Sequence, residues 1–258
     1  MAKLVVAGGN GFIGSEICRI AVQNGHEVAA FGRTGRPDLT PARHPWVQDV
    51  EWRAADVFAV DTWQDLLEGA DALVHSIATI REAPERNVTF ERVNGESVLH
   101  AAQAAEDAGV EGFVFLSVRD ALPFVSGRFL AAKRRAEREL TEQYDALRSV
   151  VLRPNLVYGP GRRGSATLAA VLEQGPSFGD GYASVEGRPL PVELVAAAAV
   201  HAAVTSTLEG TLSVPQIADL GHTSGLVDPD ELSEAALAPL LAGLGGIALG
   251  AWLWRRWT

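Results

Sequence analysis

The sequence predicts an α/β protein built on a Rossmann-type, doubly wound parallel sheet, with a small C-terminal lobe and a C-terminal apolar helix. Short apolar segments alternate with longer helical patterns from the first residues onward, as expected for strands covered by helices on both faces. A glycine cluster directly follows the first apolar segment, and the regular alternation ends after residue 153. We therefore predict three parts, formed by residues 1–158, 159–227 and 228–258.

Local patterns predict each strand and helix. Apolar runs without alternation predict buried strands at Lys3–Ala7, Glu27–Phe31, Val50–Ala54, Ala72–Ser76, Gly112–Leu116 and Ser149–Arg153. Helical patterns between them cover Phe12–Asn24, Thr62–Glu68, Phe90–Ala108 and Arg128–Tyr144. Glycine follows the first three of these helices, as it does at many helix ends. The alternation of strand and helix favours a parallel sheet with crossover helices.

The chain changes character beyond Arg153. Residues 159–187 are rich in glycine and predict loops around one helix at Ala166–Gln174. An alanine-rich helix is expected at Val192–Ser206. We interpret residues 159–227 as a small substrate lobe above the carboxyl edge of the sheet.

The composition excludes several classes of protein. A length of 258 residues suits one domain with an elaborated end, and 47% hydrophobic residues exclude a disordered chain. The net charge of −10 argues against nucleic-acid binding. Cys18 is the single cysteine and the histidines lack metal-ligand spacing, so neither a disulfide framework nor a metal centre is expected.

The cluster from residue 8 to residue 14 has the spacing of a dinucleotide-binding turn, because it lies between a strand and a helix. Gly8 allows the tight turn, Gly11 lets the backbone approach a pyrophosphate, and Gly14 lets the helix pack closely on the strand. Free N–H groups at the start of the helix would then bind the phosphates. The residues predicted to bind the dinucleotide here are Gly8, Asn10, Gly11, Phe12, Ile13 and Gly14.

The end of the second strand indicates which dinucleotide is bound. Proteins that prefer NAD usually place a carboxylate there for the ribose hydroxyls. This chain has none and instead carries Arg33 and Arg36, which are suited to pair with a 2′-phosphate. We therefore predict NADP(H) as the preferred cofactor, with NAD(H) as the alternative. Asp56 and Val57, after the third strand, are expected beside the adenine.

The glycine cluster and Asp56-Val57 belong to a set of motifs that resembles the extended and atypical short-chain dehydrogenase/reductases. The other members of the set are Ser117, Lys133 and the segment Arg153-Pro154-Asn155-Leu156-Val157-Tyr158-Gly159-Pro160-Gly161. These proteins are also described as NAD-dependent epimerases/dehydratases. The resemblance covers about residues 1–220. Within the superfamily the chain looks most like an atypical branch that contains the reductase-like accessory subunit of respiratory complex I and proteins associated with ubiquinone synthesis.

The resemblance implies roles for further positions. Lys133 would hydrogen-bond the nicotinamide ribose and is the catalytic residue that the resemblance supplies. Asn94 matches a structural asparagine, to which we assign no chemical role. The remaining positions implied to contact the dinucleotide are Ser76, Ile77, Ala78, Ser117 and Pro154.

The chain departs from the family at the residues that transfer a proton. Active members pair a tyrosine with a lysine four residues later, and the lysine lowers the pKa of the phenol so that it exchanges a proton with the substrate. Here Phe129 holds the tyrosine position. The partner serine is expected at Val118, and Ser117 precedes that position by one residue.

Three hypotheses follow from this departure. The favoured one is that the chain binds NADP(H) as a structural or redox-sensing module near quinone or respiratory-chain metabolism. The second is an active reductase or epimerase, acting on a small-molecule or quinone-like substrate with Tyr158, Ser126 or a water as proton donor. The third, loss of the cofactor, is disfavoured by the intact glycine motif.

An uncharged run of 20 residues at Ala235–Trp254 predicts membrane contact through residues 235–258. As a helix this run would span about 30 Å, the thickness of the hydrocarbon layer of a bilayer. The alternative is a helix that packs on the domain or on a partner subunit. Because the sequence begins without a signal-peptide pattern, we expect a cytoplasmic protein associated with the cytoplasmic face of a membrane.

Overall fold

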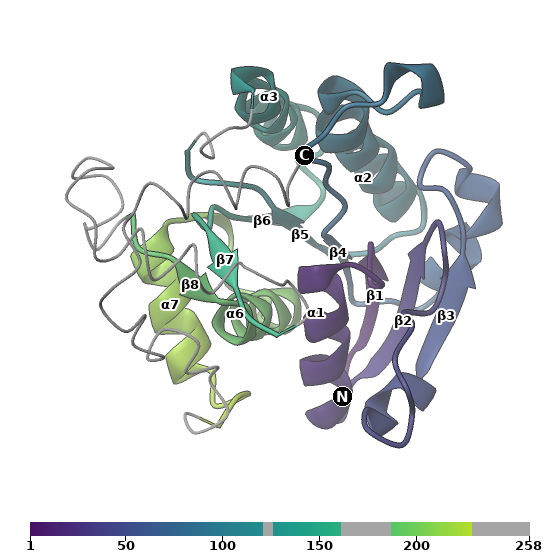
Figure 1. Cartoon of the computed structure of the whole chain (residues 1–258), viewed down its shortest axis with the longest axis vertical. Coiled ribbons are helices and arrows are strands. Elements are labelled where there is room, and N and C mark those ends of the chain that lie inside the picture. The colour runs from purple at the N-terminus through teal and green to yellow at the C-terminus, as the bar shows by residue number, and fades with distance from the viewer. Residues whose placement is uncertain (121–125, 161–186, 229–258) are drawn as a thin grey trace, which may run out of the picture.

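The computed structural model describes residues 1–120, 126–160 and 187–228, and a seven-stranded parallel sheet forms their centre (Figure 1). The strands lie in the order β3-β2-β1-β4-β5-β6-β9, and every neighbouring pair is parallel. Their bounds are β1 Lys3–Ala7, β2 Glu27–Gly32, β3 Val50–Ala54, β4 Ala72–His75, β5 Gly112–Leu116, β6 Arg148–Leu152 and β9 Gly210–Leu212. The strand order reverses between β1 and β4, which is where doubly wound sheets open a crevice for ligands.

Helices cover both faces of the sheet (Figure 1). One face carries α1 (Phe12–Gln23), α6 (Val192–Val204) and α7 (Val214–Thr223), and the other carries α2 (Ser97–Asp107) and α3 (Gly127–Gln143). Alternate residues of β1 belong to separate cores, because successive side chains of a strand point to opposite faces. The predicted Rossmann-type α/β fold is thereby confirmed.

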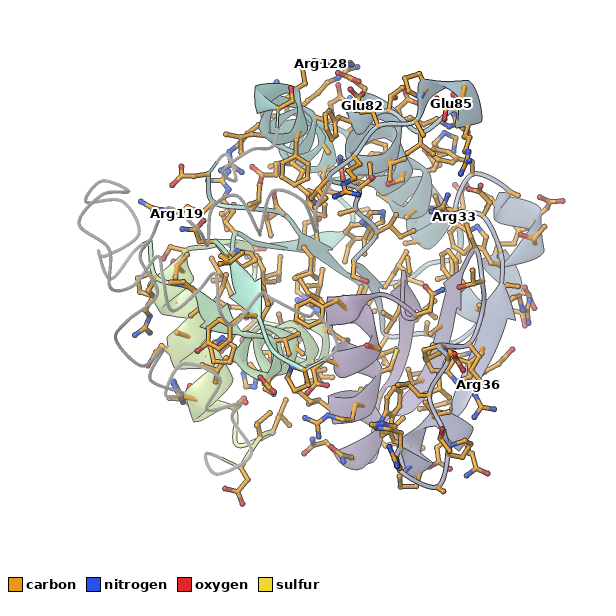
Figure 2. All side chains as sticks on the ribbon, viewed as in Figure 1. Arg33, Arg36, Glu82, Glu85, Arg119 and Arg128 are labelled. Carbon is orange, nitrogen blue, oxygen red and sulfur yellow. The ribbon has the colours of Figure 1, made fainter. Side chains whose placement is uncertain are left out.

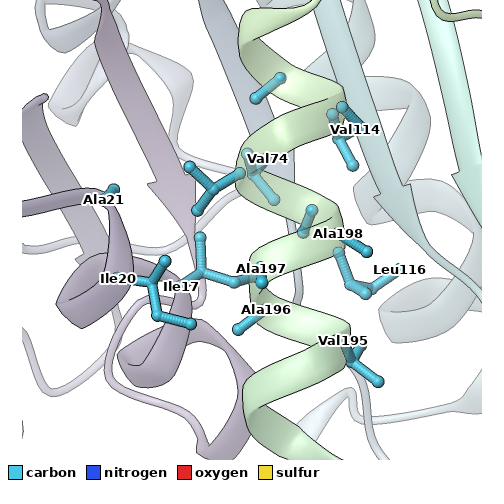
Figure 3. Close-up of a cluster of buried hydrophobic side chains, with 14 of the residues drawn as sticks. Ile17, Ile20, Ala21, Val74, Val114, Leu116, Val195, Ala196, Ala197 and Ala198 are labelled. Carbon is cyan, nitrogen blue, oxygen red and sulfur yellow. The ribbon is translucent and has the colours of Figure 1, made fainter. Parts of the chain in front are cut away.

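The alanine-rich helix α6 is the centre of the first core (Figure 3). The run of alanines at positions 196 to 199 is fully buried between α1 and the sheet, beside Ile17 and Val74. Small side chains allow this close approach, and a Cβ at Gly221 of α7 would lie only 2.6 Å from the Leu194 carbonyl oxygen of α6. The described part of the predicted substrate lobe therefore packs on the Rossmann sheet, and the domain division at residue 158 stays a prediction.

The predicted strands agree with the observed ones to within one residue at each end. The helix predicted at Thr62–Glu68 is wrong, because the chain there forms two short 3-10 turns, Val60–Thr62 and Gln64–Leu67. Trp63 between these turns is fully buried and stacks on Phe31 of β2, with ring centroids 4.4 Å apart. Packing of one large ring thus prevails over a weak helical pattern.

Some predicted helices and strands differ from those in the structure, and others lie outside the residues that the structure describes. The predicted helix Phe90–Ala108 contains a π-helical turn at Arg92–Glu96 before α2 begins. A short parallel pair formed by β7 (Val157–Tyr158) and β8 (Leu190–Pro191) was not expected. The predicted helices at Ala166–Gln174 and in residues 228–258 lie outside the described residues, apart from residue 228. Of the helices that the structure describes, none has the length and apolar character of a membrane span.

Candidate dinucleotide site

The predicted cofactor residues meet at one edge of the sheet. Because all seven strands are parallel, their carboxyl ends point the same way, and the segment that follows each strand lies along that edge. The glycine turn follows β1, and the other predicted residues follow their strands as Arg33 after β2, Asp56 after β3, Ser76 after β4, Ser117 after β5 and Pro154 after β6.

The glycine turn has the geometry of a phosphate cradle. Gly8 adopts a φ of +84°, which favours glycine, and its N–H donates to the Phe31 carbonyl over 2.8 Å. A Cβ at Gly14 would lie 2.7 Å from Ser76 Oγ and still closer to the Gly8 carbonyl oxygen, so helix and strand approach as the spacing predicts. Gly11 is exposed and begins α1 as its N-cap, with no side chain between the backbone and a ligand. The turn therefore fits a dinucleotide pyrophosphate.

Asn10 links the glycine turn to the end of β2. Its Nδ2 donates to Thr34 Oγ1 over 2.5 Å, and its amide occupies the space that a side chain at Gly32 would need. The side chain of Asn10 is thus directed at the loop after β2. Phe12 and Ile13, the first residues of α1, are half-buried and pack against the first core.

The loop after β2 presents cations and no carboxylate. Arg33 and Arg36 are exposed, and neither forms a hydrogen bond or ion pair with the residues that the structure describes. Figure 2 draws Arg33 closer than Arg36 to the carboxyl end of β2. Asp56 is exposed and accepts a hydrogen bond from the Phe58 N–H over 3.1 Å, whereas Val57 is buried.

The loop after β4 is held by two polar side chains. Ser76 Oγ donates to the Ala7 carbonyl of β1 over 2.8 Å, and Ile77 lies against Gly8. Asn94, buried in the π-helical turn, accepts from the Thr79 N–H and donates to the Thr79 carbonyl, each over 2.9 Å. Ala78 between these two anchors is exposed at the site. The structural role expected for Asn94 is to clamp this loop.

Lys133 is buried on α3 beside the end of β5. Its Nζ donates to the Leu116 carbonyl over 2.8 Å and lies 4.8 Å from the ring centroid of Phe115. Burial lowers the pKa of this ammonium to about 7. The nearby His75, at the end of β4, is fully buried and shares a hydrogen bond of 3.1 Å with Ser97, and burial lowers its pKa to about 3. His75 is therefore a neutral core residue, as its position on a buried strand indicates.

Phe129 and Val118 belong to one buried apolar cluster. They pack with Phe90 and Ala132, and the rings of Phe90 and Phe129 meet edge to face with centroids 6.0 Å apart. Lys133 Nζ lies 5.9 Å from the ring centroid of Phe129. The two positions at which the resemblance expects tyrosine and serine are thus neighbours in space, and both are apolar.

Glu137 is a site residue that the sequence interpretation missed. Charged residues dominate the sequence from residue 133 to residue 139, a pattern typical of a solvated helix face, but Glu137 is only 5% exposed. It accepts a hydrogen bond from Ser117 Oγ and pairs with Arg134 over 2.6 Å and Arg153 over 2.5 Å. The signal was present, because Glu137 follows Lys133 by one helical turn and therefore shares its buried face.

We expect the stability of the unliganded protein to rise with pH because of Lys133. Its pKa is about 7 in the folded state against 10.5 as the ordinary value, so the unfolded chain binds more protons between these pH values. The free energy of unfolding then rises by at most about 1.4 kcal/mol per pH unit in that window. Below the folded pKa the slope disappears, because both states are protonated. Urea titrations of wild type and Lys133→Met across the window should show this slope in the wild type alone, and parallel profiles would contradict it.

The parallel sheet, the glycine turn at the start of α1 and the buried lysine on α3 define a Rossmann-type protein of the short-chain dehydrogenase/reductase kind. The chain belongs to the NAD dependent epimerase/dehydratase family, whose model matches residues 4–177. This membership confirms the superfamily that the sequence motifs resemble.

Three relatives illustrate the range of proteins to which the chain is similar. An uncharacterized chloroplastic protein of Arabidopsis thaliana is 40% identical over 160 residues, which cover 61% of this chain and 51% of that protein. MIOREX complex component 2 of Saccharomyces cerevisiae is 26% identical over 60% of this chain and 73% of its own length. A 3 beta-hydroxysteroid dehydrogenase/Delta 5-->4-isomerase of Mycobacterium tuberculosis is 28% identical over 62% of this chain and 48% of its own length. The chain thus spans about half the length of two of these relatives.

Among solved structures, the UDP-glucuronic acid 4-epimerase of Bacillus cereus in complex with NAD shares this fold. It superposes with a TM-score of 0.59 at 20% sequence identity, over 82% of this chain and 77% of the epimerase chain. At this sequence identity the similarity shows a shared fold alone. That fold is consistent with the order and direction of the strands in this chain.

Proposed function

We propose that this protein binds NADP(H) as a structural or redox-sensing module and does not perform the usual acid/base chemistry of its family. The observation that carries the proposal is the buried apolar cluster beside Lys133, to which both Phe129 and Val118 belong. Neither side chain can donate or accept a proton. A missing general acid typically lowers the rate of such a reaction about 100- to 10,000-fold.

The residues that would hold the cofactor are those gathered at the carboxyl edge of the sheet. The glycine turn would receive the pyrophosphate at Gly11 and the start of α1, and Arg33 would pair with the 2′-phosphate. Lys133 would hydrogen-bond the nicotinamide ribose, bordered by Pro154. When bound, the dinucleotide supplies hydride transfer and a redox state that a partner can sense.

The relatives are consistent with both a binding and a catalytic role. The yeast relative is named as a component of a complex, which supports a structural role, and the mycobacterial relative is named as a dehydrogenase/isomerase. A place near quinone or respiratory-chain metabolism is part of the proposal and rests on the branch that the glycine and strand motifs resemble.

The proposal is tested by separating cofactor binding from turnover. Purified full-length protein is first analysed for co-purifying nucleotide and titrated with NADPH in a calorimeter, where saturable binding is expected. Oxidation of NADPH is then followed with a panel of quinones and carbonyl compounds, where turnover is expected to be negligible. Tight binding without turnover supports the module. Rapid turnover with a pH profile that shows one essential group would instead support the enzyme.

The second candidate function is an active reductase or epimerase with another proton donor. It is favoured by the dehydrogenase relative and by Tyr158, a phenol that is buried on β7, four residues after Pro154. Ser126 is a weaker candidate, because it is exposed and its Oγ caps α3 by accepting from the Arg128 N–H over 3.3 Å. If this alternative holds, Tyr158→Phe should remove the turnover and Ser126→Ala should not.

We also propose that residues 235–258 bring the protein to a membrane. The support is the uncharged run of 20 residues followed by arginines and tryptophans. Expressed in cells, the full chain is expected in the membrane fraction, and a chain truncated before Ala235 is expected in the supernatant. A full chain that remains in the supernatant without detergent would show that this segment packs on protein instead.

A further inference from the structure

A tight turn at the end of β2 carries Arg33. The Gly35 N–H donates to the Gly32 carbonyl over 2.9 Å, and the Ala55 N–H, just after β3, donates to the same carbonyl over 3.0 Å. Arg33 and Thr34 are therefore the central residues of a β-turn, which we call the β2 turn. Gly35 ends this turn with a φ of +67° and is buried. The backbone that carries Arg33 is thus held at the ends of β2 and β3.

Asn10 holds the same turn from the glycine turn after β1. Its Nδ2 donates to Thr34 Oγ1 over 2.5 Å, which is the hydrogen bond that the Asn10 side chain forms within the described part of the chain. Gly32 leaves room for this contact, because a Cβ at Gly32 would overlap Asn10 Oδ1. The half-buried amide therefore connects two turns that lie far apart in the sequence.

The two connected turns would bind different parts of one cofactor. Asn10 directly precedes Gly11, the exposed N-cap of α1 at which the pyrophosphate is proposed to bind. Thr34 directly follows Arg33, which is proposed to pair with the 2′-phosphate. The Arg33 guanidinium has no hydrogen bond or ion pair within the described part of the chain, so its position depends on the backbone of the β2 turn. A cation that is placed before the ligand arrives loses less conformational freedom on binding.

We propose that Asn10 is a positioning residue that sets the preference for NADPH over NADH, because it holds, through Thr34, the turn that presents Arg33. This inference rests on the proposed NADP(H) binding and names the residue that controls its selectivity. A direct contact between Asn10 and the ribose or pyrophosphate would have a different effect. NADPH and NADH share those groups, so such a contact would stabilise both dinucleotides equally.

The test is a calorimetric titration of the full chain with NADPH and with NADH, for the wild type, Asn10→Ala, Thr34→Val and the double variant. Each single variant should weaken NADPH binding about three- to tenfold and leave NADH binding unchanged. The double variant should be no weaker than the single variants, because both substitutions remove the same hydrogen bond. Thr34 is exposed, so Thr34→Val keeps the test valid if Asn10→Ala fails to fold.

Two further variants make the result specific. In an Arg33→Ala background, Asn10→Ala should cause no further loss of NADPH affinity, because the β2 turn then presents no cation. Asn24→Ala is the matched control, since the Asn24 amide also connects two distant segments by donating to the Leu226 carbonyl over 3.1 Å. Asn24 lies at the other end of α1 from the glycine turn, so its loss should leave both affinities unchanged.

The outcomes separate this inference from the proposed function. A preference of the wild type for NADPH that persists in folded Asn10→Ala and Thr34→Val proteins overturns the inference and leaves NADP(H) binding intact. An equal loss of NADPH and NADH affinity in Asn10→Ala also overturns it, in favour of a direct contact. Equal affinities of the wild type for the two dinucleotides refute the proposed preference itself, and that result is obtained before any variant is measured.

Discussion

Phe129→Tyr is expected to raise the rate of NADPH oxidation by about 100- to 10,000-fold over the wild type, once an acceptor is found in the quinone and carbonyl panel. The new phenol would lie one helical turn before Lys133, whose Nζ is 5.9 Å from the present ring centroid. The ammonium would favour the phenolate, so that the hydroxyl could supply a proton. The physical reason is that the new hydroxyl would restore the proton donor that Phe129 lacks, while Val118 would still hold the serine position.

The matched control is Phe90→Tyr. It adds the same hydroxyl to the same apolar cluster, from the ring that meets Phe129 edge to face. It should not raise the rate, since Phe90 lies outside α3 and has no lysine one turn away. The double variant Phe129→Tyr with Val118→Ser should exceed the single variant, because serine would restore the second polar position.

The outcome of this series discriminates between the two candidate functions. A rise in rate with Phe129→Tyr indicates a site that retains substrate and cofactor geometry and lacks its acid. No rise in a folded variant that still binds NADPH contradicts the prediction and indicates that other parts of the catalytic geometry are also missing. Measuring thermal unfolding of each variant is required, because a buried hydroxyl without a partner costs about 1–3 kcal/mol.

Arg33→Ala is expected to weaken NADPH binding by about 1.5–3 kcal/mol, which corresponds to about 10- to 150-fold in Kd. The guanidinium is exposed after β2 and has no carboxylate partner among the described residues, so it is available for a 2′-phosphate. The affinity for NADH should stay nearly unchanged, because NADH lacks that phosphate. Calorimetric titration of both dinucleotides against both proteins measures the difference directly.

Arg36→Ala is the matched control for this experiment. Both arginines belong to the same loop, but Arg36 is drawn farther from the end of β2, and its loss should affect NADPH binding less (Figure 2). Equal affinities of the wild type for NADPH and NADH would contradict the predicted preference for NADP(H). In that case the exposed arginines would be ordinary solvated residues of the loop.

The sequence alone predicted much of the fold because the signals are local. An apolar run without alternation predicts a doubly covered strand, and the observed β1, β3 and β5 begin and end where these runs do. Gly8 and Gly14 could be assigned to the turn because backbone conformation and close contact require glycine at these positions. Lys133 was assigned from the resemblance to the short-chain dehydrogenase/reductases, in which a lysine follows the tyrosine position by four residues on one helix.

Other features depended on contacts between distant parts of the chain. The segment around Trp63 has a helical pattern, yet the ring turns inward onto Phe31 and the chain forms 3-10 turns. The alanine-rich helix α6 was assigned to the small C-terminal lobe, and the structure shows that its small side chains let it lie between α1 and the sheet. Composition shows that a helix is apolar on all sides, but it does not show which elements cover it.

By itself the sequence determined the parallel α/β architecture, the glycine turn and the loss of the tyrosine at Phe129, since each follows from residues close together in the chain. Only the tertiary structure decided that Val118 and Phe129 belong to one buried apolar cluster, and that Glu137 is buried and paired with Arg134 and Arg153. The physical reason is that the charge state and burial of a side chain depend on the neighbours that folding brings to it. The sequence of a charged helix segment is the same whether its side chains face water or are buried against the end of a strand, so the sequence does not show which of them are buried.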